Sequence, residues 1–316
     1  MANTNYWDTA RGPRLHEVVF RNDLSPQQAL ELVCTTEGEV DIVTEVSPAD
    51  ASRVEASEHA TLVAIDAVQT IVGIINRDAD GVPLNDVRAR QALNLAIDRA
   101  ALVREALYGR AVPLARLTPL FAVPWLNRRL GYRHDPGRAA ELWRSAAADG
   151  QTRPLRIAAW SGMESVARRV AADLTAALGL EVEVAVVHGA AEREARRQLA
   201  EMRGPYGWDI LILQQRAQAV DAPPLEQHRA FVGQSGEFRA GPVVPEFEEL
   251  YAELTRQTSR MRQGLTACRI DRFVSNTALA LFLCAPQALY AVNRHVAFIP
   301  YRTTFELAEC HVGQQY

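Results

Sequence analysis

The residues best placed for chemistry follow an apolar run in the second half of the chain. Residues 208–214 read Trp-Asp-Ile-Leu-Ile-Leu-Gln, which predicts a buried strand. Gln214, Gln215, Arg216 and Gln218 stand at its end. Ligands of open α/β sheets commonly bind beyond the carboxyl ends of the strands, and an arginine there could hold the carboxylate or phosphate of an anionic small molecule in a bidentate pair. The alternative is a polar loop with a solvated arginine.

The other reactive side chains form no recognisable site. The 7 histidines show neither i,i+4 pairing nor the spacing of metal ligands. Cys34, Cys268, Cys284 and Cys310 lie far apart, so we expect three buried thiols and one exposed thiol. A Cys268–Cys284 or Cys284–Cys310 disulfide remains an alternative if the protein is exported. No phosphate loop or dinucleotide fingerprint is present, and we expect no metal, no cofactor and no covalent chemistry.

Composition narrows the class of protein. The 316 residues suffice for two lobes, and 48% hydrophobic with 23% charged residues is ordinary for a soluble globular chain. A net charge of −4 gives no basic surface for nucleic acid, which we do not expect as a partner. All 34 basic residues are arginine, which excludes lysine Schiff bases and phosphate-loop lysines.

The amino-terminal sequence carries no export pattern. MANTNYWDTARG lacks the cationic and apolar regions of a signal peptide, and no run approaches the roughly 18 apolar residues that span a bilayer. As written, the chain is expected to be soluble and cytoplasmic.

One long helix, residues 83–108, dominates the predicted elements. Its apolar residues recur every three or four positions and place one face in the core. Asn85 or Asp86 can cap its start, and Gly109 can end it.

The remaining elements alternate between strand and helix. Before the long helix we expect a strand at 14–21, a helix from Ser25 to Gly38, a strand at 40–43, a helix at 48–57, and two strands within 60–75 that break near Asp66. After an irregular connector at 111–136 we expect helices at 136–149, 163–178, 190–203, 244–262 and 264–275, strands at 154–160, 180–187, 208–214 and 288–296, and loops over 215–243. This order predicts a parallel or mixed sheet.

Six short segments, taken in order, resemble one known family. They are Asn5-Tyr6-Trp7 with Leu15 to Phe20, Glu37 to Ile42, Pro83 to Val103, Gly131 to Pro136, Tyr206 to Ile210, and Tyr290 to Val292 with Val296 to Phe298. Together they are similar to the family 5 extracellular solute-binding proteins, the peptide- and nickel-binding group that serves ABC transporters. Each segment alone is weak, whereas their order along nearly the whole chain is specific.

The resemblance implies an α/β, two-lobed, periplasmic-binding-protein-like fold of type II. Residues 1–82 plus 286–316 would form lobe I, and 83–285 would form lobe II. The chain begins where family members are already well under way, so the first lobe is expected to be incomplete. An incomplete sheet leaves an exposed edge, which a second copy could cover, giving a homo-oligomer.

The resemblance also implies reversible, non-covalent binding of a small solute in a cleft between the lobes, for delivery to an ABC permease. It places Gln69 and Tyr290 at cleft-facing positions of lobe I, so the expected ligand residues are Gln69, Gln214, Gln215, Arg216, Gln218 and Tyr290. Where the family commonly has a tryptophan wall and an aspartate that pairs with a ligand amine, this chain has Gln214 to Ala219. That departure argues against the family's usual way of binding peptides, because a buried amine would lack its carboxylate.

Two alternatives stay open from the sequence. The first is a cytoplasmic, repurposed member that acts as a ligand sensor or as an enzyme of a metabolic gene cluster. An acid/base pair in the cleft would favour the enzyme, and none is identified. The second is a degenerate fragment that folds only as a dimer or not at all.

Overall fold

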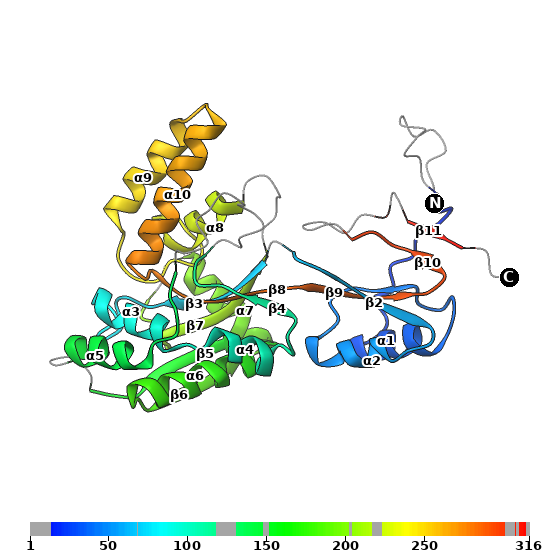
Figure 1. Ribbon diagram of the computed structural model, residues 1–316, viewed down its shortest axis with the longest axis horizontal. Coiled ribbons are helices and arrows are strands. Elements are labelled where there is room, and N and C mark those ends of the chain that lie inside the picture. Colours follow the sequence, from blue (N-terminus) through cyan, green and yellow to red (C-terminus); the bar gives the residue numbers. More distant parts are fainter. Residues whose placement is uncertain are drawn as a thin grey trace. The chain divides into compact units, whose positions relative to one another are not determined.

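The computed structural model describes residues 14–67, 69–117, 131–147, 152–201, 204–216, 223–300, 307 and 310–313. The chain divides into two compact units, shown in Figure 1. Unit 1 comprises Met1–Ala67 and Gln287–Tyr316, and unit 2 comprises Val68–Pro286.

Unit 1 has a small antiparallel sheet with the order β1-β9-β2. The strands are β1 (Ile42–Val43), β9 (Ala288–Asn293) and β2 (Ala60–Ile65). The helices are α1 (Pro26–Thr35), the short 3-10 helix η1 (Pro48–Asp50) and α2 (Ala51–Glu55), and a separate pair is formed by β10 (Val296–Ala297) and β11 (His311–Val312). Ser25 and Gln28 form a capping box at the start of α1, which begins where the sequence predicts a helix. The core of this unit joins α1 and α2 to β9.

Unit 2 is built on a mixed sheet of six strands. Its order is β4-β8-β3-β7-β5-β6, with β4 (Ala111–Pro113), β8 (Ala280–Pro286), β3 (Gln69–Ile75), β7 (Ile210–Arg216), β5 (Leu155–Trp160) and β6 (Val182–Val187). Strand β5 runs parallel to β6 and β7, and the other pairs are antiparallel. The expectation of a parallel or mixed sheet is confirmed.

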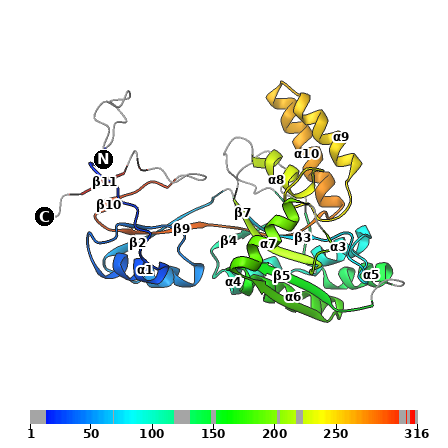
Figure 2. The same cartoon turned by 180° about the vertical axis from the view of Figure 1, so that it is seen from behind.

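Helices cover both faces of this sheet. One core joins it to α3 (Val87–Ala96), α4 (Arg99–Ala106), α5 (Pro136–Ala147) and α6 (Glu164–Leu178). The other joins it to α7 (Gly189–Ala200), α8 (Pro223–Val232), α9 (Pro245–Arg256) and α10 (Arg260–Asn276). Figures 1 and 2 show α9 and α10 on the opposite side of the sheet from α5 and α6. Along β3, Ile71 and Ile75 belong to the first core whereas Val72 and Ile74 belong to the second, as the period of two requires.

The boundary between the units differs from the expected one at residue 82. Strand β3 pairs with β7 on one side and with β8 on the other, so it is a central strand of unit 2. The chain therefore divides before β3, and residues 68–82 belong to unit 2. The second division falls after Pro286, one residue later than expected.

The predicted single helix over 83–108 is wrong, because it is two helices, α3 and α4. Asp98 caps α4, since its Oδ1 accepts from the backbone N–H of Ala101 at 3.0 Å. Its own N–H donates to Asp173 Oδ2 at 3.0 Å rather than to the turn before it. Asp86 caps α3, as expected, but α4 ends at Ala106 with Leu107 as its C-cap, and Gly109 follows two residues later with φ of 78°.

Several smaller expectations also fail. Residues 14–21 form no strand, and Val19 and Phe20 are 68% and 75% exposed. Strand β8 and helix α8 were not expected: β8 is apolar without alternation, and α8 lies in a stretch of turn residues.

The four cysteines are free thiols; Cys34, Cys284 and Cys310 are buried and Cys268 is partly exposed. In the residues that the structure describes, no helix is long and apolar enough to cross a membrane.

Candidate functional site

Most of the predicted ligand residues lie at the end of the unit 2 sheet where the parallel strands terminate, which we call the carboxyl edge. The parallel strands β5, β6 and β7 all end there, at Trp160, Val187 and Arg216. Antiparallel pairing brings the start of β3 and the end of β8 to the same edge. The chain also leaves unit 2 from this edge twice, before Gln69 and after Pro286. This edge is the place where open α/β sheets bind ligands.

Gln69 and Gln214 form a hydrogen-bonded pair at this edge. The Gln69 side chain is 2% exposed, and its Nε2 donates to the carbonyl oxygen of Pro286 at 3.1 Å. Its Oε1 accepts from Gln214 Nε2 at 2.9 Å. The Gln69 amide is thus satisfied within the fold, and it fixes the position of Gln214. Gln69 belongs to unit 2, so its expected place on the first lobe is wrong.

The strand register divides the predicted residues between two faces. Gln69 lies opposite Arg216, and Ile71 lies opposite Gln214, so Gln69, Gln214 and Arg216 share the face of the first core. Gln215 lies opposite Thr70 on the other face. The four residues are adjacent in the sheet, but they do not converge on one point.

The last two predicted residues stand apart from this edge. Gln218 lies outside the described residues. Tyr290 belongs to β9 in unit 1, where it is 9% exposed and its ring packs edge-on against Phe298 at 5.2 Å. The structure therefore brings Gln69, Gln214, Gln215 and Arg216 together, and Tyr290 is a buried residue of the other unit.

Three residues at the same edge were missed by sequence reasoning. Ser161 directly follows β5, and His188 and Glu192 follow β6. Ser161 Oγ donates to Glu192 Oε2 at 2.9 Å and lies 3.1 Å from His188 Nδ1. The rule that singled out residues after 208–214 applies equally to residues after the predicted strands 154–160 and 180–187, so this signal was present in the sequence.

The hydrogen bonds of this cluster differ from those of a catalytic triad. In a catalytic triad the acid binds the far nitrogen of the histidine, whereas Glu192 here accepts directly from the serine hydroxyl. Burial alone would raise the pKa of Glu192, but hydrogen bonds from Arg196 and Ser161 outweigh it and lower that pKa. Glu192 is thus held as an anion. The Arg196 Nη2 lies 2.8 Å from Glu192 Oε1. The Arg196 Cζ lies 3.5 Å from the centroid of the Trp160 ring, which is a cation–π contact.

No metal centre accompanies these groups. Among the described residues, no group of three or more His, Cys, Asp or Glu side chains could hold a metal ion.

Comparisons with known proteins place the chain in one group. The family model described as "Bacterial extracellular solute-binding proteins, family 5 Middle" matches residues 1–214. The dipeptide-binding protein of Escherichia coli strain K12 is 24% identical over 144 residues, which is 46% of this chain and 26% of that protein. The chain thus spans about a quarter of that curated relative.

Solved structures share the fold at low identity. The ABC transporter substrate-binding protein CtaP of Listeria monocytogenes matches with a TM-score of 0.77 and 14% identity, over 94% of this chain and 60% of its own. HbpA2 of Haemophilus parasuis matches with a TM-score of 0.75 and 14% identity, over 99% of this chain and 61% of its own. NikA of Staphylococcus aureus, in complex with Ni(L-His)2, matches with a TM-score of 0.69 and 14% identity, over 88% of this chain and 57% of its own.

These matches confirm the expected two-lobed α/β fold, of which the chain spans about 60% in these structures. The family match covers more than half of the sequence, and the order of motifs agrees with it. The chain belongs to the family 5 bacterial extracellular solute-binding proteins, the peptide and nickel type of ABC transporters.

Proposed function

We propose that this chain holds a small solute non-covalently at the carboxyl edge of β5, β6 and β7, as the solute-receiving component of an ABC importer. In this proposal the two units close on the solute and bury it. The chain then presents the solute to a membrane permease. No bond is made or broken.

The observation that carries this proposal is that several polar side chains lie along a single sheet edge, although on both of its faces. Gln214 and Arg216 from β7, Ser161 after β5 and His188 after β6 all lie there. Both passages of the chain toward unit 1 start from the same edge. In this proposal the two passages act as the hinge of closure, beside the row of polar side chains.

We further propose that the solute carries a carboxylate. The relatives include a dipeptide-binding protein, a protein in complex with the dipeptide Met-Leu and one in complex with Ni(L-His)2, and these ligands all contain carboxylates. Arg216 is exposed at the end of β7, where its guanidinium can form a bidentate pair with such a group. Gln214, fixed by Gln69, would lie beside it on the same face.

Replacing Arg216 with glutamine is expected to weaken binding by at least about tenfold, because one charge-assisted pair is lost. The measurement is titration calorimetry with Met-Leu and Ni(L-His)2 as probes. Arg138→Gln is the matched control, since Arg138 is an exposed arginine of α5 paired with Glu141. Equal affinities for the wild type and Arg216→Gln, with any probe that binds, would show that Arg216 does not hold the carboxylate.

We also propose that unit 1 pairs with a second copy of the chain. Strand β2 is at the edge of its sheet and pairs only with β9 among the described strands, over six residues. An unpaired edge of this length is a template for antiparallel pairing. We expect a dimeric mass in light scattering, and Ala64→Pro should shift that mass to the monomer, because the N–H of the exposed Ala64 lies on the open side of β2 and not on the side paired with β9. A wild-type monomer at micromolar concentration would contradict this proposal.

A further inference from the structure

The sheet of unit 2 has a second polar region at its other edge. Strand β7 starts there at Ile210, beside the end of β3 at Ile75 and near the start of β5. The seven residues of β7 separate this edge from Arg216 by about 20 Å. A cavity of about 480 Å³ lies at this far edge, within the size range of small-molecule sites. Its charged lining residues are Asp78, Asp80, Arg153, Arg156 and Arg239.

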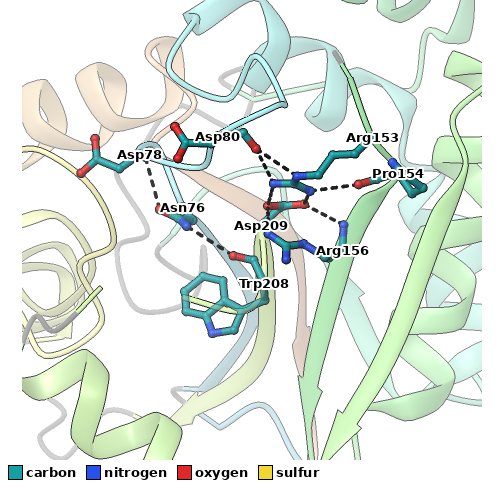
Figure 3. A network of polar contacts seen from close by, with 8 residues as sticks. All are labelled: Asn76, Asp78, Asp80, Arg153, Pro154, Arg156, Trp208 and Asp209. Atoms are coloured by element: carbon teal, nitrogen blue, oxygen red, sulfur yellow. Dashed lines mark hydrogen bonds and ion pairs between the residues drawn. The ribbon is translucent and has the colours of Figure 1, made fainter. Parts of the chain in front are cut away.

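A buried ion pair holds one wall of this cavity in place. Asp209 is fully buried, and Arg153 donates to both of its carboxylate oxygens at 2.7 Å. The backbone N–H of Arg156 adds a third hydrogen bond at 2.8 Å. Arg153 also donates to the carbonyl oxygens of Asp80 and Pro154, as Figure 3 shows. Asp209 and Arg153 are therefore occupied by one another and by the backbone, and they serve as the frame of the cavity.

Arg156, Asp78 and Asp80 lie next to this frame. The Arg156 guanidinium makes one long contact, 3.4 Å from Nη2 to Asp209, and no other side-chain hydrogen bond in the described part of the chain. The carboxylates of Asp78 and Asp80 accept no hydrogen bond from described residues, and Figure 3 shows both directed away from the Asp209 pair. The cavity thus carries an available cation and two available anions on walls that are already fixed.

An aromatic surface completes the cavity. Tyr206 lines it and stacks on Trp208 with ring centroids 4.8 Å apart. Asn76 links the start of β7 to the loop after β3, because its Nδ2 donates to the carbonyl oxygen of Trp208 and its Oδ1 accepts from the N–H of Asp78. The loop that carries the two aspartates is therefore tied to the strand that carries the aromatic pair.

We propose that this far-edge cavity is a second binding site, for a small zwitterion such as a free amino acid or a dipeptide. Arg156 binds the carboxylate, Asp78 and Asp80 bind the ammonium group, and Tyr206 packs against the apolar part. A solute with one charge of each sign pairs all of these groups, whereas a simple anion faces two carboxylates and a simple cation faces Arg156 and Arg239. This site is separate from the carboxyl edge of the sheet.

The test is titration calorimetry of the full chain with Ala-Ala, N-acetyl-Ala-Ala, Ala-Ala amide and inorganic phosphate. We expect Ala-Ala to bind, and each blocked peptide to bind at least about tenfold more weakly, because each lacks one charge. Arg156→Gln and Asp80→Asn should each weaken Ala-Ala at least about tenfold, while the surface control Arg138→Gln should not. The Arg156 variant keeps the backbone N–H that binds Asp209, so it is expected to unfold at the wild-type temperature.

Three results would overturn this proposal. Equal binding of N-acetyl-Ala-Ala and Ala-Ala would show that the ammonium group is not recognised. Binding of phosphate that becomes tighter in Asp80→Asn would identify a simple anion site. Loss of Ala-Ala binding in Arg216→Gln but not in Arg156→Gln would place the peptide at the other edge, and the proposed function would then stand without a second site.

Discussion

Replacing Arg99 with methionine is expected to lower the free energy of unfolding of unit 2 by about 3–5 kcal/mol. Arg99 is the first residue of α4 and is 6% exposed. Its guanidinium donates to the carbonyl oxygens of Phe282 at 3.0 Å, Asn94 at 3.0 Å and Leu114 at 3.2 Å. Methionine fills a similar volume without a donor, so these buried carbonyls would lose their partner together.

The chemistry of this site explains why the loss should be large. Burial lowers the pKa of Arg99 to about 10, so the guanidinium is still charged at neutral pH. The guanidinium donates to the carbonyl oxygen of Asn94 near the end of α3 and to the carbonyl oxygen of Phe282 in β8. The arginine therefore ties the break between α3 and α4 to the sheet.

The measurement is urea unfolding followed by circular dichroism. Arg104→Met is the control in the same helix, because that side chain is 67% exposed, and its change should stay within about 0.5 kcal/mol. For a domain of this size, the Arg99 loss corresponds to a fall in Tm of about 6–20 °C. Equal midpoints for Arg99→Met and Arg104→Met would show that the carbonyls are satisfied without Arg99.

Replacing Asp209 with asparagine is expected to lower the free energy of unfolding by about 2–4 kcal/mol at neutral pH. The asparagine side chain has the same shape, but its NH2 group would meet the donors of Arg153 and Arg156. The cost stays below that of a fully buried pair, because the Arg153 side chain is 26% exposed and can regain water.

The same variant is expected to change how stability depends on pH. Burial is the largest single effect on Asp209 and raises its pKa, but hydrogen bonds from Arg153 and the Arg156 backbone outweigh it and lower that pKa. A carboxyl with a lowered folded-state pKa contributes its full stability above the unfolded value near about 4, and loses it as pH falls through the folded value. The gap between wild type and Asp209→Asn should therefore be constant above about pH 5 and shrink below about pH 4.

Unfolding in urea at a series of pH values checks this expectation. Glu141→Gln serves as the control carboxyl, since its side chain is 58% exposed and pairs only at the surface with Arg138. A gap for Asp209→Asn that does not change between neutral pH and about pH 3 would contradict an ionised, hydrogen-bonded Asp209.

Local patterns in the sequence predicted the layers of unit 2 well. The alternation of strands 154–160, 180–187 and 208–214 with helices is present as β5, β6 and β7. The caps at Ser25 and Asp86 are also where the sequence indicates, because a cap depends on only a few neighbouring residues.

Other features depend on contacts between distant parts of the chain. The helix break at Asp98 is stabilised by a hydrogen bond to Asp173 and by the hydrogen bond of Arg99 to β8. The apolar periodicity within 83–108 cannot reveal these distant partners. Strand β3 reads as apolar in either unit, and only its pairing with β7 and β8 assigns it to unit 2.

The candidate site was predicted in part for the same reason. The position of Gln214 to Arg216 follows from one strand and one general rule of α/β sheets, and it is confirmed as lying at the carboxyl edge. The alternation along β7 puts Gln215 on the other face from Gln214 and Arg216, but only the register with β3 places Gln69 opposite Arg216. The far-edge cavity joins residues from the ends of β3, β5 and β7 with the loop at Arg239, and no local spacing connects them.

Native mass spectrometry of the gently purified chain tests the central claim, solute binding at the carboxyl edge of unit 2, most directly. We expect the protein to carry a small molecule, or to take up Met-Leu or Ni(L-His)2 when these are added, as a discrete one-to-one mass shift. Arg216→Gln should lose most of that shift, whereas Arg138→Gln should keep it. A bare mass with every probe, for wild type and both variants alike, would contradict the account.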